Sequence, residues 1–419
     1  MKTHLIIGAL LGLAGLTEAA AQVPIRVFAN SAHQTAFQGT PNRPETNLQA
    51  AFERETGFKI VWETVPWPQM QQNLLRTLSS GTSQFDVVMI ESSWPSRDVL
   101  EKLVSLKERQ AQALELAKIF PSMLAAYQLD GDLRAVPIRS NPQIIHYNKQ
   151  IFEERGITAP KTFEDFLAAA EKASHKRADG ASVYGLAIKP EEDIITTVKA
   201  MGGNVLTDDH EVKVTEPKTI KAIERLRTLV ERGALPPNFA SMDATSVQTM
   251  MREGLAAMSL FGDNYYNRFN DPASSRVAGK VGFFAIPGSA EGSFAPAKMA
   301  FWGAAFPANG RAEGREAAWT FIRYLASPAV QLRMAQNGNG PVDPETLANP
   351  AFVAAAPYSA ASAAALANGA SPLPVFEGAN QVRDIFVKEA VAAMMGRKSA
   401  QAAMTDAHAQ IQPLVAARR

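Results

Sequence analysis

Residues 25–90 alternate between strand-like and helix-like segments, and this alternation limits the possible folds more than any other feature of the chain. Three short apolar runs predict strands at 25–29, 58–62 and 85–90. Two segments with helical spacing lie between them, at 47–56 and 67–78. Gly57 follows the first helical segment, where glycine ends a helix most easily, and a polar loop is expected over 30–41. Strands separated by helices predict the mostly parallel sheet of an α/β protein.

A second set of elements begins near Tyr147. Thr162 and Asp165 form a capping-box pattern at the start of a helix. The further elements expected are strands at 183–187 and 281–286 and helices at 215–230, 313–325, 330–336 and within the alanine-rich stretch 354–370. Because 419 residues exceed what one hydrophobic core usually serves, the chain is expected to form two domains.

The N-terminus has the order of a secretory signal peptide. Lys2 supplies a positive charge, residues 5–16 carry no charge, and the small residues 19–21 follow. The apolar run is shorter than the roughly 20 residues that span a bilayer. We therefore expect residues 1–21 to be a leader that is cleaved after Ala21, the alternatives being a membrane anchor or a buried first helix.

Composition narrows the class of protein. The chain contains no cysteine, which excludes disulfides, thiolate metal sites, a cysteine nucleophile and a lipid-anchored N-terminal cysteine. Its 42 basic and 41 acidic residues give a net charge of +1, and no block of basic residues occurs. Neither nucleic acid nor a lipid surface is therefore an expected partner. With the leader, this predicts a free, soluble protein held in the periplasm.

Motifs for metal, nucleotide or covalent chemistry are missing from the sequence. The histidines show no pair at ligand spacing, and they stand at positions 4, 33, 146, 175, 210 and 408. No nucleophile elbow, P-loop or glycine-rich dinucleotide turn occurs either. We therefore expect no metal, no cofactor and no catalytic residue. A glycosidase would need two carboxylates that face each other in space, an arrangement that the sequence leaves open.

Polar and aromatic residues follow the predicted strands, where ligands bind in open α/β sheets. The candidates after the first three strands are Asn30, Ser31, His33, Gln34, Glu63, Trp67, Glu91, Ser92 and Trp94. A sugar presents a flat apolar face ringed by hydroxyls, so an aromatic ring beside planar polar groups, such as Trp94 near Glu91, suits it. Trp302 is a further candidate because Gly303 lets the backbone approach a ligand. A core or lid position is the alternative for Trp94, and Trp62 is expected in the core.

Several short motifs occur in one order along nearly the whole chain. They are 52–57 followed by 60–61, FDVV at 85–88, Pro137 and then YNKQIF at 147–152, PKTFEDF at 160–166, REGLAAM at 252–258, IPG at 286–288, and AAWTFI with LASP within 317–328. In this order they resemble the extracellular solute-binding proteins of family 1, the maltose-binding-protein-like receptors of ABC sugar importers. The chain departs from the family at Phe85, where proline is usual, and at Phe301, where glycine is frequent.

The resemblance implies a fold, a division of the chain into two lobes, and a function. The implied fold is the two-lobe periplasmic binding protein fold of type II, α/β, with a mostly parallel sheet flanked by helices in each lobe and a hinge between them. The implied lobes are 23–138 with 290–342, and 139–289 with 343–419. The implied function is that of a monomeric, non-enzymatic receptor that closes on a sugar or sugar-like solute and delivers it to the permease subunits of an ABC transporter.

The resemblance also implies ligand contacts. These are 30–34, 91–94, Arg139, Asn141, Asp263, Asn264, Tyr265, Trp302 and Gly303. The guanidinium fork of Arg139 suits a sugar hydroxyl, a carboxylate or a phosphate, and it could instead pair with an acidic neighbour. The alternatives to a neutral sugar are therefore an anionic or charged solute (a sugar acid, glycerol phosphate or a polyamine). A secreted carbohydrate-active enzyme is a further alternative.

Overall fold

The computed structural model describes residues 24–39, 46–110, 113–295, 298–368, 373–374, 376 and 378–416, with Trp67, Pro68, Leu114 and Met299 described by backbone alone. The predicted leader and its cleavage site lie outside these residues. Within the described part of the chain, no helix is both long and apolar enough to cross a membrane.

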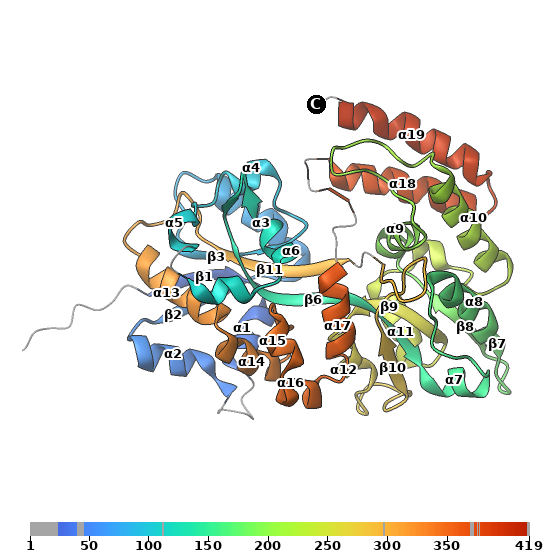
Figure 1. Cartoon of the computed structure of the whole chain (residues 1–419), viewed down its shortest axis with the longest axis horizontal. Helices are drawn as coiled ribbons and strands as arrows, with labels where there is room; N and C mark the ends of the chain where they lie inside the picture. The colour runs from blue at the N-terminus through green and yellow to red at the C-terminus, as the bar shows by residue number, and fades with distance from the viewer. Residues whose placement is uncertain are drawn as a thin grey trace, which may run out of the picture.

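Two groups of elements lie on either side of one long strand, β6 (Val136–Asn148), which runs through both (Figure 1). The first half of β6, up to Pro142, pairs with β11 (Met299–Ala305) in the first group. From Gln143 onward the same strand pairs with β9 (Ala256–Gly262) and β10 (Val281–Phe284) in the second group. The two groups therefore share one continuous sheet, ordered β2-β1-β3-β11-β6-β9-β8-β7, with β10 also on β6.

The remaining elements divide between the groups. The first group contains β1 (Ile25–Ala29), α1 (Ser31–Gln38), α2 (Leu48–Thr56), β2 (Ile60–Thr64), α3 (Trp67–Ser79), β3 (Val87–Glu91), α4 (Arg97–Leu100), α5 (Lys107–Gln110), the 3-10 helix η2 (Leu114–Lys118), α6 (Pro121–Ala125), β4 (Gln128–Leu129), β5 (Asp132–Leu133), α13 (Arg315–Ala326), α14 (Pro328–Gln336), α15 (Pro344–Ala348) and α16 (Pro350–Ala355). The second group contains α7 (Lys149–Glu154), α8 (Phe163–Ala173), β7 (His175–Lys176), β8 (Ser182–Ala187), α9 (Pro190–Ala200), α10 (Pro217–Glu231), η3 (Phe239–Ser241), α11 (Ala244–Arg252), α12 (Tyr265–Phe269), α18 (Ala379–Met394) and α19 (Ala400–Ala416). Helix α17 (Ser359–Asn368) packs on β6 between them.

Strand directions confirm the α/β class. Strands β1, β2 and β3 are parallel, as are β8 and β9. Strand β11 is antiparallel to both of its neighbours, and β6 is antiparallel to β9 and β10. Every residue of β3 is buried, as expected for a strand covered on both faces. Each group thus contains parallel strands, and the strands at the junction between the groups are antiparallel to their neighbours.

Local signals account for most element ends. Gly57 ends α2 in the left-handed conformation, with φ 76°. Thr162 and Asp165 form the reciprocal capping box of α8, in which each side chain accepts from the other residue's backbone N–H. The prediction of a polar loop over 30–41 is wrong for its first part, because α1 begins directly after β1. Asn30 caps it by accepting from the backbone N–H groups of Ala32 and His33 at 2.9 and 3.3 Å.

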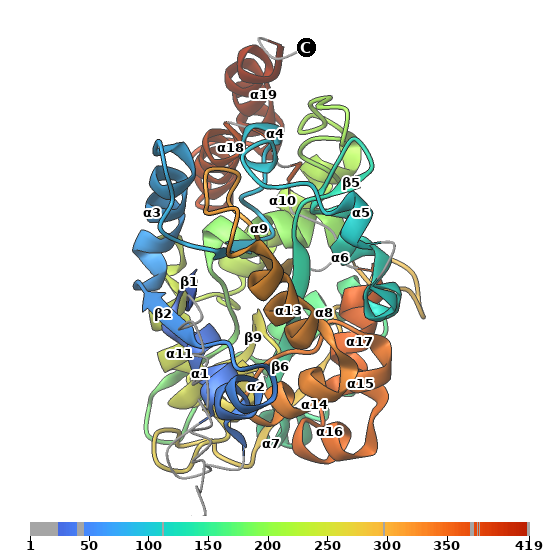
Figure 2. The same cartoon turned by 90° about the vertical axis from the view of Figure 1, so that its left-hand side faces the viewer.

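The described chain passes between the groups along β6; β10 and β11 belong to different groups, as do α16 and α18. Helices α15 and α16 pack on α14, whereas α18 packs on α9, α10 and α19. Figures 1 and 2 show α14, α15 and α16 together, with α18 and α19 at the other end of the molecule. These contacts place 344–355 with the first group, although the sequence prediction assigned everything after 343 to the second lobe. The change of partner on β6 falls at 142/143 rather than at the predicted boundary of 138/139.

Candidate functional site

A cavity of about 460 Å³ lies where the two groups meet. It is lined from the first group by the ends of β1 and β3, the start of α1 and the first half of β11. The second group supplies α9, α11, α12 and the end of β9, and the middle of β6 lies between them. The lining residues are Asn30, Ala32, Glu91, Arg139, Asn141, Gln143, Lys189, Glu192, Ala244, Phe261, Gly262, Asn264, Tyr265, Arg268, Lys298, Ala300 and Trp302.

Trp302 gives the first-group wall an aromatic surface. Its side chain is buried on β11, with 5% of the residue exposed. His33 meets it edge-on with ring centroids 4.5 Å apart, and Trp94 does so at 5.2 Å. Three aromatic rings from α1, β11 and the loop after β3 therefore support one another, which limits how far the indole of Trp302 can tilt.

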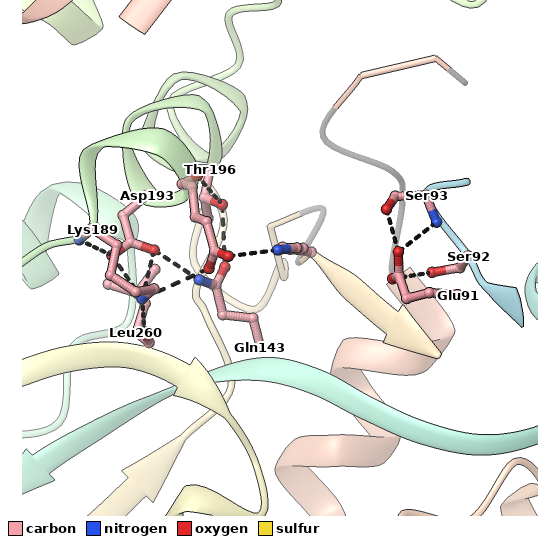
Figure 3. Close-up of polar contacts among 10 residues, drawn as sticks. Glu91, Ser92, Ser93, Gln143, Lys189, Asp193, Thr196 and Leu260 are labelled. Atoms are coloured by element: carbon pink, nitrogen blue, oxygen red, sulfur yellow. Dashed lines mark hydrogen bonds and ion pairs between the residues drawn. The ribbon is translucent and has the colours of Figure 1, made fainter. Parts of the chain in front are cut away.

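Glu91 ends β3 beside this wall, and its carboxylate is held by the turn that follows (Figure 3). It accepts from Ser92 Oγ at 3.0 Å, from the Ser93 backbone N–H at 2.9 Å and from Ser93 Oγ. Burial raises the pKa of Glu91 from its usual value, while the serine hydrogen bonds and Lys298 act in the opposite direction. The carboxyl group is thus fixed as a rigid polar edge of the cavity.

A buried ion pair forms part of the second-group wall (Figure 3). Lys189 Nζ lies 3.0 Å from the carboxylate of Asp193 and also donates to the backbone oxygen of Leu260. Gln143 Nε2 donates to Asp193 at 2.8 Å, and Thr196 donates to Gln143 at 3.1 Å. This network joins α9, β6 and β9, so it fixes one wall of the cavity to the shared strand.

Lys298 and Glu192 form a second ion pair in the cavity. Lys298 Nζ donates to Glu192 Oε1 at 2.8 Å, which joins the start of β11 to α9. Glu91 and Glu192 both line the cavity, and each carboxylate is already bound by neighbouring side chains. Among the described residues, no group of His, Asp and Glu side chains could hold a metal ion.

Arg139 and Asp263 lie near each other at the junction. Asp263 is 2% exposed and accepts from Ser362 Oγ at 2.6 Å. Burial raises the pKa of Asp263 to about 7, against the opposing effects of Ser362 and Arg139. Burial also lowers the pKa of Arg139 to about 10, while the charge of Asp263 acts to raise it. Arg139 thus stays cationic at neutral pH, whereas Asp263 titrates there.

Three buried polar atoms of the lining have no hydrogen-bond partner among the described residues. They are the donor Nε of Arg139 and the acceptors Oδ1 of Asn141 and Asn264. Buried polar groups are normally paired, and all three residues line the cavity, so a ligand bound there is a source of the missing partners. A ligand that both donates and accepts, as a hydroxyl does, would satisfy all three.

The structure brings seven of the predicted contacts to the cavity: Asn30, Glu91, Arg139, Asn141, Asn264, Tyr265 and Trp302. His33, Ser92 and Trp94 lie directly behind this lining and touch Trp302 or Glu91. Asp263 is buried against α17.

Other predicted contacts lie away from the lining. Glu63 is exposed on the edge strand β2 and accepts from Gln84 at 3.1 Å. Gln34 lies on α1, and a Cβ on Gly303 would meet the ring of Tyr127 rather than the cavity. Trp67 begins α3, and its side chain lies outside the described part of the structure.

The sequence prediction missed several lining residues from the second group, from β6 and from the start of β11. The missed side chains with polar or aromatic groups are Gln143, Lys189, Glu192, Phe261, Arg268 and Lys298. A signal existed for two of them, because Lys189 and Glu192 follow β8 at the start of α9, as strand-end ligands do. Gln143 and Lys298 had no local signal, since β6 and the start of β11 reach the cavity only through pairing between the groups.

Comparisons with known proteins agree with this architecture. A Brucella abortus protein described as a binding protein is 24% identical over 371 residues, 87% of each chain. The mannitol-binding protein of Pseudomonas aeruginosa is 22% identical over 322 residues, 73% of this chain and 72% of its own. The crystal structure of an ABC transporter solute-binding protein from Agrobacterium radiobacter in complex with ribitol superposes with a TM-score of 0.76. It is 23% identical and covers 94% of this chain and 99% of its own.

The last structure shares the two-lobe fold, which confirms the predicted fold class. A family model for bacterial extracellular solute-binding proteins matches residues 47–361, well over half of the chain. The matched range includes every lining residue of the cavity except Asn30 and Ala32, and the whole of β6. The chain therefore belongs to the bacterial extracellular solute-binding protein family.

Proposed function

We propose that the protein is the periplasmic receptor of an ABC importer and that its solute is a sugar or a polyol. The observation that carries this proposal is the cavity between the two groups, where Trp302 faces the same space as the unpaired acceptors of Asn141 and Asn264. An aromatic face covers the C–H groups of a polyhydroxy compound, and amide oxygens accept from its hydroxyls.

The relatives support the same class of solute. One relative is a mannitol-binding protein, and one structure of the same fold holds ribitol. Mannitol and ribitol are polyols, and a cavity of about 460 Å³ has room for a solute of that size. A polyamine finds less support because it is cationic and its ammonium groups only donate, so it would leave the Nε donor of Arg139 without an acceptor.

Binding would stabilise a closed arrangement because the cavity takes side chains from both groups. A solute that contacts Trp302 and Asn264 at once bridges the first and second groups, and only such a solute favours closure. Strand β6, which pairs in both groups, would bend as they close. The closed form would then dock on the permease subunits, which release the solute across the membrane.

The remaining parts of the proposal concern location and chemistry. We place the receptor in the periplasm, as a monomer that is exported by a leader cleaved near Ala21 and has no nucleic-acid partner. The family consists of solute-binding proteins rather than enzymes. Glu91 and Glu192 would accordingly hold the solute without cleaving it, because their oxygens are bound by serine and lysine neighbours.

A thermal-shift screen of the purified protein tests the proposal. The panel holds pentitols, hexitols, mono- and disaccharides, sugar acids, polyamines and amino acids. A solute at 100 times its Kd should stabilise the native state by about 2.7 kcal/mol, which raises the melting temperature measurably. A shift with polyols, sugars or their acids is expected, with the solute recovered unchanged. A shift with polyamines or amino acids alone, or turnover of the solute, would refute it.

A further inference from the structure

Arg139 carries a positive charge in the lining of the cavity, and no described side chain forms a hydrogen bond with it. It stands in the middle of β6, is half-buried, and its buried Nε has no partner. Asp263 is near enough to affect its pKa, but the carboxylate of Asp263 accepts from Ser362 instead. A buried guanidinium is costly to leave without an anionic or polar partner.

The lysines of the cavity differ from Arg139 in this respect. Lys189 lies 3.0 Å from Asp193, and Lys298 lies 2.8 Å from Glu192. The first pair forms at the start of α9 and the second joins the start of β11 to α9, so the protein itself neutralises these two cations. The positive charge left for a ligand is therefore on the arginine side of the cavity.

Arg268 adds a second positive group on that side. It is exposed on α12, lines the same cavity, and lies with its guanidinium carbon 4.8 Å from the centre of the Tyr265 ring. Arg139 and Arg268 line the same cavity, and the charge of Arg268 acts to lower the pKa of Arg139. Among the described residues, no carboxylate forms an ion pair with Arg268.

Hydroxyl acceptors lie on the same part of the lining. Asn141 follows Arg139 by two positions on β6, so both side chains lie on one face of the strand. Asn264 precedes α12, which carries Arg268. The Oδ1 atoms of both asparagines are buried without a partner. One end of the cavity thus combines cationic groups that can bind an anion with side chains that can accept hydrogen bonds from a ligand.

Resting on the proposed function, we infer that the solute is an acidic member of the sugar and polyol class, such as an aldonate or a uronate. Arg139 binds its carboxylate, Arg268 adds positive charge at the rim, and hydroxyls donate to Asn141 and Asn264. A carboxylate matches the planar donor fork of a guanidinium. Its single charge also balances that of Arg139.

Calorimetric titration with matched solutes tests this inference. Ribitol is compared with ribonate, mannitol with mannonate, and glucose with glucuronate, so that each pair differs by the oxidation of one carbon; ribitol 5-phosphate is the phosphate counterpart. The acid of at least one pair should bind about tenfold or more tightly than its neutral partner, since a charge-assisted hydrogen bond is gained. Its affinity should fall as salt is raised from low to physiological concentration, while that of the neutral partner stays constant.

Substitutions locate the effect. Arg139→Gln should reduce the affinity of the acid to that of its neutral partner and change the neutral partner less than about threefold. Arg139→Lys should keep part of the preference, because it keeps the charge and loses the fork. Arg268→Gln should weaken acid binding by a smaller factor. Arg54→Gln, which removes a charge from the exposed side of α2, is the matched control and should change nothing.

The outcomes separate the two proposals. Equal or tighter binding of the neutral partners in every pair overturns the acidic solute and leaves the sugar and polyol receptor standing. Tighter binding of ribitol 5-phosphate than of ribonate overturns the assignment of a carboxylate. A preference for acids that survives Arg139→Gln overturns the role of Arg139. Failure of every polyol, sugar and acid to bind the native protein overturns the proposed function itself.

Discussion

Trp302 shows how a side chain can be both buried and part of a ligand site. Its ring packs against His33 and Trp94 on one side and lines the cavity on the other. Both nitrogens of His33 are buried without a hydrogen-bond partner among the described residues. Burial lowers the pKa of His33 well below its usual value, and the nearby charge of Arg139 lowers it further. His33 is thus a neutral packing ring rather than a ligand contact.

Trp302→Ala should weaken binding of the solute by about 1–3 kcal/mol, as expected for a buried aromatic anchor. Trp94→Ala should weaken it by less, because Trp94 acts through the orientation of Trp302. Titration calorimetry on the two variants measures both effects, and circular dichroism checks that the fold survives. Wild-type affinity in both variants would show that the solute binds elsewhere.

Asp263 should make the stability of the protein depend on pH near neutrality. Its pKa is raised to about 7 by burial, whereas an unfolded chain has the ordinary value of 3.8. Between these two values the native state holds a proton that the unfolded state has lost. The contribution of this group to stability is therefore complete below about pH 4 and is lost as the pH rises through 7, by a few kcal/mol in all.

Asp263→Asn should remove this dependence, since an amide keeps an acceptor for Ser362 and does not titrate. Melting temperatures of wild type and variant, measured from pH 4 to 8, give the difference directly. The melting temperature of the variant should increase relative to that of wild type as the pH rises. A difference that stays constant over this range would contradict the raised pKa.

At the scale of elements, β6 is the strand on which the site depends. It carries Arg139 and Asn141 in its first half and Gln143 where its pairing changes to the second group. The segment at Gly340 lies directly on it: the Ser140 N–H donates to Gly340 O at 2.8 Å, and Ser140 Oγ donates to Pro341 O at 2.5 Å. A Cβ on Gly340 would lie 2.0 Å from Ser140 O.

Gly340→Ala should destabilise the native state by about 1–3 kcal/mol, as overpacking usually does. It should also weaken solute binding, because the displaced backbone is next to Arg139. Gly81→Ala is the control, since a Cβ there meets nothing within 4 Å. Urea unfolding of both variants measures the effect. Equal stability of the two would show that β6 and the Gly340 segment tolerate separation.

At the scale of the whole molecule, the cavity belongs to neither group alone. Glu91 and Trp302 come from the first group, and Lys189 and Asn264 come from the second. The ion pair between Lys298 and Glu192 already crosses between them. A solute that fills the cavity should therefore restrict both groups together.

Hydrogen exchange should show protection on both sides of the cavity when solute binds. Peptides that cover the ends of β1 and β3 in the first group, and those that cover the start of α9 and the end of β9 in the second, should exchange more slowly. Helix α19 packs on α10 and α18 and contributes no residue to the lining of the cavity, so it serves as the internal control. Protection confined to one group would contradict closure around the solute.

The sequence by itself determined the α/β class, most strands and helices, and their ends. These features follow from short-range patterns: the continuous apolar run that became β3, the capping box of α8, and Gly57 at the end of α2. Seven lining residues were predicted too. Those that follow the first three strands could be predicted because ligands bind beyond the carboxyl ends of parallel strands, and the order of strands and helices shows where those ends are. Helix α1 was missed although its cap, Asn30, was a local signal.

Only the tertiary structure decided how distant segments meet. Strand β6 joins both groups into one sheet, Asp263 is bonded to Ser362 of α17, and Lys298 is paired with Glu192. It also decided that α15 and α16 pack with the first group. Each of these contacts joins residues that are far apart in the chain, so no periodicity of 2 or 3.6 residues encodes them. They arise because burying the apolar faces of both groups fixes where the chain crosses between them, and the free charge of Arg139 follows from that arrangement.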